Sequence, residues 1–191
     1  MDNQRALDIF HQTGALLSGH FKLTSGLHSD QYFQCAKVLQ HPTFAEELCR
    51  TAKEEFKGQK PDLVIAPAVG GIVVGQEVAR QLGARSLFAE RQEGEMTLRR
   101  GFSISPGEKA LVAEDVVTTG GSVKEVVKLV QERGGDVLGV FSIVDRSGGK
   151  ADFGVRYVSA MQLAVTTYDP ANCPLCEKGM LVEKPGSREL Q

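Results

Sequence analysis

The stretch that decides the fold runs from Leu111 to Val123 and reads LVAEDVVTTGGSV. It begins as an apolar run, continues into the adjacent carboxylates Glu114 and Asp115, and ends on two threonines, two glycines and a serine before an amphipathic segment. The apolar run is typical of a buried strand, and the helical pattern behind the turn completes a strand–turn–helix unit. Units of this kind build a mostly parallel sheet.

The turn of this stretch has the composition of a phosphate-binding loop. Gly120 and Gly121 tolerate positive φ and leave neighbouring backbone N–H groups uncovered. The start of a helix attracts anions, and the hydroxyls of Thr118, Thr119 and Ser122 add donors. Ser122 is also the expected N-cap of the helix that follows.

The two carboxylates predict a second contact with the same ligand. Beside a phosphate cradle, Glu114 and Asp115 would repel a polyphosphate unless they accept hydrogen bonds from sugar hydroxyls or hold a hard cation. Either half of the motif alone is often an ordinary turn or a solvated acidic pair, but the combination favours a sugar phosphate. The chain contains neither G-x-x-x-x-G-K-[ST] nor G-x-G-x-x-G, which argues against a P-loop and a dinucleotide site.

The rest of the chain repeats the alternation of strand-like and helix-like patterns. The expected helices span 5–17 (stopped by Gly19), 42–57 (opened by Pro42), 72–82 (stopped by Gly83) and 123–133. The expected strands span 63–68, 85–90, 110–113, 137–144 and 155–165, with loops and short strands in 21–36. This order predicts an α/β fold with helices on both faces of the sheet and a ligand site at the carboxyl ends of the strands.

Length and composition limit the classes of protein. A chain of 191 residues fits one domain with at most a small appendage. The 22 Lys and Arg against 24 Asp and Glu give a net charge of −2, which argues against a nucleic-acid partner that needs a basic surface. The polar start, Met1–Arg5, predicts no signal peptide, and no apolar run is long enough to span a bilayer. We expect a soluble, cytoplasmic protein without a membrane partner.

Three segments carry a resemblance to a known family. Leu111–Val123 resembles the thirteen-residue phosphoribosyl-diphosphate signature of type I phosphoribosyltransferases. Thr24–Phe33, TSGLHSDQYF, is similar to a segment of the orotate phosphoribosyltransferases, and Asp145-Arg146 resembles their substrate-binding D-R. The resemblance covers about Gly14 to Asp145. It implies the Rossmann-like type I fold, with a small N-terminal hood over residues 1–40, a core over 41–168 and a tail over 169–191.

The activity that the resemblance implies is transfer of a phosphoribosyl group from 5-phosphoribosyl 1-diphosphate (PRPP) to orotate. The products are orotidine 5′-monophosphate, a precursor of UMP in pyrimidine biosynthesis, and pyrophosphate. Because negative charge builds up on the leaving pyrophosphate, Mg²⁺ is the expected cofactor, and no residue is assigned as a metal ligand.

The resemblance also assigns roles to individual residues. Glu114 and Asp115 would hold the ribose hydroxyls, and the turn would cradle the 5′-phosphate. The expected PRPP contacts are Arg91, Glu114, Asp115, Val116, Val117, Thr118, Thr119, Gly120, Gly121 and Ser122. The expected orotate contacts are Thr118, Arg146, Tyr32 and Phe33, with the guanidinium of Arg146 on the carboxylate side and the two rings packed on the base.

Cations for the leaving group are expected from a mobile loop over 91–107, which in the family serves the neighbouring subunit of a homodimer. Many orotate enzymes carry R-K-x-x-K-x-H there, whereas this chain has Gln92 after Arg91 and no further lysine or histidine up to residue 100. We expect Arg99 and Arg100 to supply the charge and, with Asp115, to be the catalytic residues.

Two further lysines of the family are replaced by Thr24 and Gly70. These differences leave two alternatives open. One is a phosphoribosyltransferase for a purine base, and the other is a non-catalytic regulator that senses PRPP. The segment 24–33 favours orotate over a purine, and the near-neutral charge argues against a nucleic-acid-binding regulator.

Cys173-Pro-Leu-Cys176 forms a C-x-x-C pair near the end of the chain. One such pair supplies two of the four ligands that a zinc site usually has. No second pair follows, and His11, His20, His28 and His41 are remote in sequence. Asp169-Pro170 predicts a turn, so a structural turn packed on the core is favoured, with zinc binding as the alternative.

Overall fold

The computed structural model describes residues 2–23 and 25–185, so Thr24 and the last part of the expected tail, 186–191, lie outside it. The helices are α1 (Asn3–Gln12), α2 (Ala36–Leu39), α3 (Pro42–Phe56), α4 (Gly70–Leu82), α5 (Gly121–Glu132) and α6 (Pro174–Glu177), with 3₁₀ turns η1 (Lys57–Gln59) and η2 (Pro170–Asn172). The strands are β1 (Leu16–Lys22), β2 (His28–Phe33), β3 (Leu63–Pro67), β4 (Arg85–Gln92), β5 (Glu95–Leu98), β6 (Lys109–Val117), β7 (Asp136–Asp145), β8 (Tyr157–Gln162) and β9 (Thr167–Tyr168).

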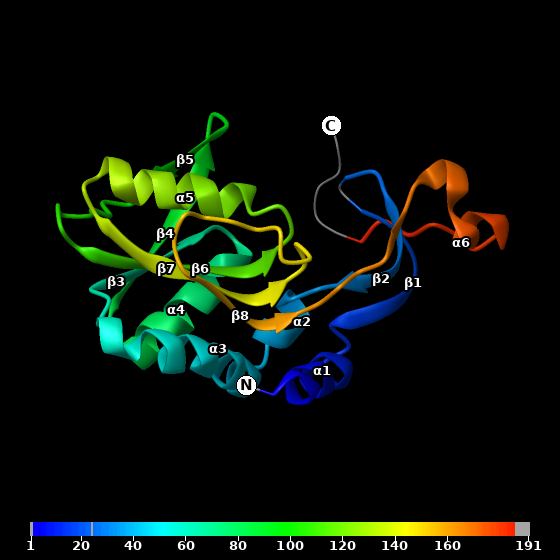
Figure 1. Cartoon of the computed structure of the whole chain (residues 1–191), viewed down its shortest axis with the longest axis horizontal. Helices are drawn as coiled ribbons and strands as arrows, with labels where there is room; N and C mark the ends of the chain where they lie inside the picture. Colours follow the sequence, from blue (N-terminus) through cyan, green and yellow to red (C-terminus); the bar gives the residue numbers. More distant parts are fainter. Residues whose placement is uncertain (1, 24, 186–191) are drawn as a thin grey trace.

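The larger sheet has the strand order β5-β4-β3-β6-β7-β8. All neighbouring strands in it are parallel except β4 and β5. Helices α3 and α4 cover one face and α5 the other (Figure 1). The α/β fold with a mostly parallel sheet is therefore confirmed, and its parallel order brings the carboxyl ends of β3, β6 and β7 to one edge.

Two apolar clusters hold the helices on the sheet. On one side, Leu48 of α3 and Val74 of α4 pack with Phe141 of β7. On the other side, Val126 and the rest of the inner face of α5 pack against β3 and β6. Strand β3 is buried along its whole length, which explains why it reads as an uninterrupted apolar run.

The first helix is shorter than predicted. The helix ends at Gln12, and Leu16 and Leu17, which were expected inside it, belong to β1. Gly14 adopts a φ of +62°, which ends the helix, and β1 then pairs antiparallel with β2. Strand pairing overrides the helical spacing of the apolar residues here.

Two predicted boundaries of the central strand–turn–helix unit were also wrong. Strand β6 extends to Val117, because Val117 pairs with Asp145 of β7, so Glu114 and Asp115 lie inside the strand rather than after it. Helix α5 begins at Gly121, and its N-cap is Gly120 rather than Ser122. Gly120 has a φ of +77°, which turns the chain into the helix two residues earlier than a cap at Ser122 would.

Helix α4 starts at Gly70, two residues earlier than predicted, because Gly70 and Gly71 belong to the helix. A Cβ on Gly71 would lie 3.2 Å from the Cβ of Ala66, and one on Gly75 would lie 3.0 Å from the same atom. The small residues let α4 approach β3 closely. Gly83, with a φ of +71°, ends the helix as predicted.

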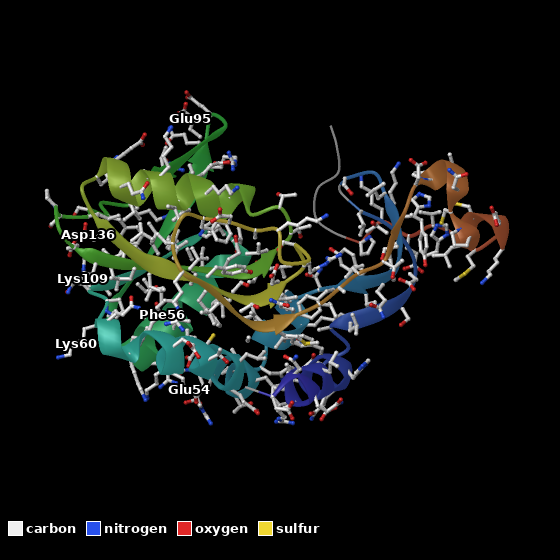
Figure 2. All side chains as sticks on the ribbon, in the orientation of Figure 1. Glu54, Phe56, Lys60, Glu95, Lys109 and Asp136 are labelled. Atoms are coloured by element: carbon white, nitrogen blue, oxygen red, sulfur yellow. The ribbon has the colours of Figure 1, made fainter. Side chains whose placement is uncertain are left out.

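The segment expected as a polar loop over 91–107 begins as a β-hairpin. Strand β4 continues to Gln92, and Glu93 and Gly94, both with positive φ, turn the chain into β5. Two central turn residues with positive φ match the twist of a tight antiparallel hairpin. Figure 2 shows Glu95 at the tip of this hairpin, directed away from the sheet.

The second lobe contains a small antiparallel sheet with the order β1-β2-β9 (Figure 1). Strand β9 follows the last strand of the large sheet in sequence but pairs with β2. The chain then passes through α6, and Glu183 forms a β-bridge with Phe21 of β1. None of the described helices combines the length and the hydropathy needed to cross a membrane.

Candidate active site

The carboxyl ends of β6 and β7 place the two most informative motifs side by side. The backbone N–H of Arg146, directly after β7, donates a hydrogen bond to the carbonyl oxygen of Val117 at 2.7 Å. The turn that starts at Thr118 and the Asp145-Arg146 pair therefore share one edge of the sheet. This is the position where open parallel sheets bind ligands.

The turn before α5 forms an anion cradle. No side chain caps the helix, and its first turn contains no acidic residue, so the first backbone N–H groups are available to a ligand. A hollow of about 330 Å³ lies in front of them. It is lined by Glu114, Val116, Val117, Thr118, Thr119, Gly120, Gly121, Ser122, Val123 and Glu125.

Gly120 is required by two features of this turn. Its φ of +77° is strained for any residue with a Cβ. A Cβ at this position would also lie 2.7 Å from Cε1 of Phe153, whose ring is buried under the turn. The path of the backbone around the cradle thus depends on a glycine.

Glu114 and Asp115 lie between the cradle and the start of α4. Glu114 is 8% exposed, and burial, followed by the charge of Asp115, raises the pKa of its carboxyl to about 9. The backbone N–H of Val116 donates to Oδ1 of Asp115 at 2.8 Å. A Cβ on Gly70 would collide with Oδ2 of Asp115, so the glycine at this position makes room for the carboxylate.

A second hollow of about 510 Å³ adjoins the cradle. It is lined by Leu23, Ser25, Tyr32, Phe33, Gln34, Cys35, Asp115, Val116, Thr118, Thr119 and Arg146. Val116, Thr118 and Thr119 line both hollows. A ligand with a phosphate at one end and a flat ring at the other can therefore span them.

Arg146 is the main cation of the second hollow. Burial lowers the pKa of its guanidinium, while nearby Tyr32 opposes this effect. Its Nε is buried, and no hydrogen-bond partner for it lies within the described residues. A buried guanidinium donor without a partner suits a carboxylate or imide of a ligand.

Comparison with known proteins agrees with this geometry. Residues 34–153 match the family model described as "phosphoribosyl transferase domain". The chain belongs to the phosphoribosyltransferase family. A protein of Desulforamulus reducens named orotate phosphoribosyltransferase is 57% identical over 190 residues, and the match covers 100% of both chains. A protein of Caldanaerobacter subterraneus with the same name is 55% identical, again over the full length of both.

The fold is also that of solved phosphoribosyltransferases. The orotate phosphoribosyltransferase of Aeropyrum pernix matches with a TM-score of 0.70 at 24% identity, covering 82% of this chain and 92% of the other. The adenine phosphoribosyltransferase of Rhodothermus marinus matches with a TM-score of 0.68 at 20% identity, covering 84% and 100%. The fold alone therefore does not distinguish the bases.

In this phosphoribosyltransferase, the two aromatic rings expected to contact the base, those of Tyr32 and Phe33, have different surroundings. Tyr32 lines the second hollow and packs against Phe21, with ring centroids 5.7 Å apart. Phe33 also borders the hollow but is only 4% exposed, and its ring packs on Phe10 at 4.6 Å. Neighbouring residues of a strand point to opposite faces, which explains why the ring of Tyr32 packs on Phe21 and the ring of Phe33 on Phe10.

Four residues that line the second hollow of this phosphoribosyltransferase were not predicted from the sequence. The second hollow is also bordered by Leu23 and Ser25, from the connection between β1 and β2, and by Gln34 and Cys35, which follow β2. Ser25 lies in the TSGLHSDQYF segment, which was the available signal. Burial, followed by the charge of Asp115, raises the pKa of the Cys35 thiol, so it is neutral rather than nucleophilic.

The three expected arginines divide into two groups. Arg91 forms an ion pair at 2.7 Å with Glu125, a residue of the cradle wall, and therefore lies at the rim of the cradle. Arg100 pairs with Glu90 at 2.8 Å on the β4–β5 hairpin, and Arg99 is exposed next to it. Neither Arg99 nor Arg100 is among the residues that line the two hollows.

Proposed function

We infer that this phosphoribosyltransferase transfers the phosphoribosyl group of PRPP to orotate. The C1′–O bond to pyrophosphate breaks, a bond forms between C1′ and a ring nitrogen of orotate, and that nitrogen releases its proton. The products are orotidine 5′-monophosphate and pyrophosphate. The full-length relatives named orotate phosphoribosyltransferase support this activity, and with it a role in UMP synthesis.

The observation that carries the choice of base is the position of Arg146. Its guanidinium, whose Nε has no partner among the described residues, shares the hollow with Thr118, which also belongs to the proposed phosphate cradle. Orotate has a carboxylate and an imide on one flat ring, and a planar guanidinium can pair with either group. Adenine and hypoxanthine have no carboxylate for this cation.

The residues of the cradle would bind two different parts of PRPP. The backbone N–H groups at the start of α5 and the hydroxyls of Thr118, Thr119 and Ser122 would bind the 5′-phosphate. Asp115, with Glu114 beside it, would accept hydrogen bonds from the ribose hydroxyls. The cradle and the carboxylates would hold PRPP while Arg146 holds the base, so that C1′ faces the base. Fixed geometry of this kind lowers the barrier to displacement.

The acidic pair also fits Mg²⁺, because its carboxylate oxygens are the hard donors that this ion prefers. Asp115 and Glu114 would hold the ion through its waters, and the bound ion would neutralise charge on the leaving pyrophosphate. Burial, followed by the charge of Asp115, raises the pKa of Glu114, and a bound cation would oppose this shift.

Arg99 and Arg100 directly follow β5, and neither lines the two hollows of its own chain. We propose that the chain forms a homodimer in which these arginines act at the partner's site, and that residues 1–40, 41–168 and 169–191 act as hood, core and tail. The proposed location of the reaction is the cytoplasm.

Orotate consumption tests the activity directly. Purified protein, PRPP and Mg²⁺ are mixed with orotate, and the loss of its ultraviolet absorbance is followed; adenine, hypoxanthine, xanthine and uracil run in parallel. Turnover of orotate alone is the expected result. Turnover of a purine instead would show that the substrate is a purine base and not orotate. PRPP binding without turnover of any base would indicate a non-catalytic sensor.

A further inference from the structure

Four potential metal ligands that are distant in sequence converge in the second lobe. They are His20 of β1, His28 of β2, and Cys173 and Cys176 at α6. Their ligand atoms all lie within 4.8 Å of one another. Figure 2 shows sulfur atoms gathered beside α6, away from the large sheet. This cluster is separate from the hollows described above and is independent of the proposed function.

The distances between the ligand atoms are close to those of a tetrahedral site. His20 Nε2 lies 2.9 Å from His28 Nδ1, 3.6 Å from Cys173 Sγ and 3.7 Å from Cys176 Sγ. Cys176 Sγ lies 3.3 Å from His28 Nδ1. A tetrahedral zinc ion with usual bond lengths would separate two nitrogens by about 3.3 Å and a nitrogen from a sulfur by about 3.6 Å.

The orientation of His20 matches that of a metal ligand. Its Nδ1 lies 2.9 Å from the carbonyl oxygen of Met180, so the Nδ1–H donates to that oxygen. The Nε2 lone pair then points toward the other three ligand atoms. Metal-binding histidines commonly have their second ring nitrogen fixed by a backbone carbonyl in this way.

The local backbone explains how the two histidines meet. The pairing of β1 with β2 is regular up to Ser18 and resumes at Phe21 with a shifted register, which marks a β-bulge around His20. A bulge redirects the side chain it carries. His20 and His28 are 2% and 7% exposed, so both imidazoles are buried although they are polar.

The cysteines reach the histidines through the chain reversal at the end of the protein. Pro174 begins α6, whose single turn places Cys173, 1% exposed, near Cys176. Beyond α6, the N–H of Glu183 donates to the carbonyl oxygen of His20 at 2.7 Å, and the N–H of Lys22 donates to Glu183 at 2.8 Å. The C-x-x-C pair therefore packs against His20 and His28 of the small sheet, whereas the sequence had favoured a turn packed on the core.

We propose that His20, His28, Cys173 and Cys176 bind one Zn²⁺ that fastens the C-terminal segment to the hairpin of β1 and β2. Two thiolates and two imidazoles are a usual ligand set of structural zinc, and four protein ligands leave no position for substrate. Strand β9 has only two residues, so the small sheet is a weak unit without such a tie. Leu23 and Ser25, between β1 and β2, line the second hollow. By fastening this hairpin, the ion also stabilises that side of the hollow.

Metal analysis of the full-length protein, purified under reducing conditions without chelator, tests the site. We expect one zinc per chain, and an X-ray absorption spectrum with two sulfur ligands at about 2.3 Å and two nitrogen ligands at about 2.0–2.1 Å. Zinc bound only by oxygen and nitrogen would overturn the proposal, since it would point to the carboxylates of the other site. Iron in place of zinc, or a Cys173–Cys176 disulfide in the reduced preparation, would also overturn it.

Variants identify the ligands. Cys173→Ser with Cys176→Ser should lose the zinc, while Cys49→Ala, which removes a buried free cysteine outside the cluster, should keep it. His28→Asn is a second variant in case the double variant does not fold, and His11→Gln, on the exposed side of α1, is its control. Full zinc content in the folded cluster variants would contradict the assignment. Removal of zinc from the wild type should lower its Tm, and added Zn²⁺ should restore it.

Discussion

Arg100 donates two hydrogen bonds to Glu90, from Nε to Oε2 and from Nη2 to Oε1, both at 2.8 Å. Its guanidinium also lies over the ring of Phe88, 5.7 Å from the centroid. The arginine that sequence reasoning assigned to pyrophosphate is thus held on its own hairpin. Arg99 beside it is exposed, and no acidic partner within ion-pair distance is found for it in the described part of the chain.

Replacing both arginines by alanine should reduce kcat more than it weakens PRPP binding. If they act on the leaving group, they stabilise charge that develops in the transition state, and losing such donors costs about 100-fold or more in kcat. Steady-state kinetics and PRPP binding of Arg99→Ala with Arg100→Ala measure this. Arg133→Ala, an exposed arginine at the far end of α5, is the control. Wild-type kinetics in the double variant would show that these two arginines take no part in the reaction.

Asp115→Asn and Glu114→Gln should behave differently, although the two acids are adjacent. In the ligand-free protein the pKa of Glu114 is raised to about 9, so its carboxyl is neutral at pH 7 and a neutral amide resembles it; Asp115 is then the main carboxylate for the ribose and the ion. Asp115→Asn should reduce turnover by about 100-fold with an unchanged Tm, and Glu114→Gln should reduce it far less. Equal losses in the two variants would contradict this division, and an unfolded Asp115→Asn would make that residue structural.

The stability of the ligand-free protein should fall as the pH rises, through Glu114. Unfolded, this carboxyl has a pKa near 4.5, and folded its pKa is about 9, so the folded state holds the proton more tightly. This stabilisation is complete below pH 4.5 and is lost progressively as the pH rises to about 9. The slope is at most about 1.4 kcal/mol per pH unit.

Urea unfolding at a series of pH values measures this slope. The decline between neutral pH and pH 9 should be shallower in Glu114→Gln than in the wild type. Glu132→Gln, at an exposed position in the last turn of α5, should keep the wild-type slope. Parallel curves for Glu114→Gln and the wild type would show that Glu114 does not titrate in this range.

Arg146→Met should raise the KM for orotate at least about tenfold, because a hydrogen-bonded charged partner of the base is lost. PRPP binding should change little, since the cradle at the start of α5 remains. Arg146→Lys keeps the charge but not the planar fork, so it should restore only part of the orotate affinity. A loss of PRPP affinity equal to that of orotate would show that Arg146 supports the cradle instead.

Gly120→Ala should destabilise the fold and weaken PRPP binding. The change forces a Cβ into positive φ, at a cost of about 1–3 kcal/mol, and drives it against Phe153. Gly107→Ala is a matched control, because Gly107 has a φ of +78° and open space around its Cα. Thermal unfolding should give a larger loss of Tm for Gly120→Ala. Equal losses would mean that the ring of Phe153 moves away at no cost.

The local pattern of the chain determined most of the large sheet. The buried strands β3, β6 and β7 read as apolar runs because both of their faces are covered by helices. The composition of the turn at Thr118 predicted the cradle, since glycines, hydroxyls and a following helix are adjacent in sequence. Arg146 could be assigned to the same edge because parallel strands end together.

Element boundaries depended on partners that local sequence does not show. Leu16 and Leu17 continue a helical spacing, yet pairing with β2 placed them in a strand. Glu114 and Asp115 lie inside β6 because β7 pairs beyond them. In each case hydrogen bonds to another strand outweigh the local conformational preference of the residues, which is worth a fraction of a kcal/mol per residue.

The sequence by itself determined the α/β class and the glycine-containing turn before α5 that is proposed to bind phosphate, because each of these is encoded within one strand–turn–helix unit. Only the tertiary structure decided that Phe33, at the border of the second hollow, packs its ring on Phe10, and that His20 and His28 meet Cys173 and Cys176. The meeting of these four ligands follows from the bulge in β1, which redirects His20, and from the return of the chain through β9, which joins segments about 150 residues apart. No local spacing can encode such contacts.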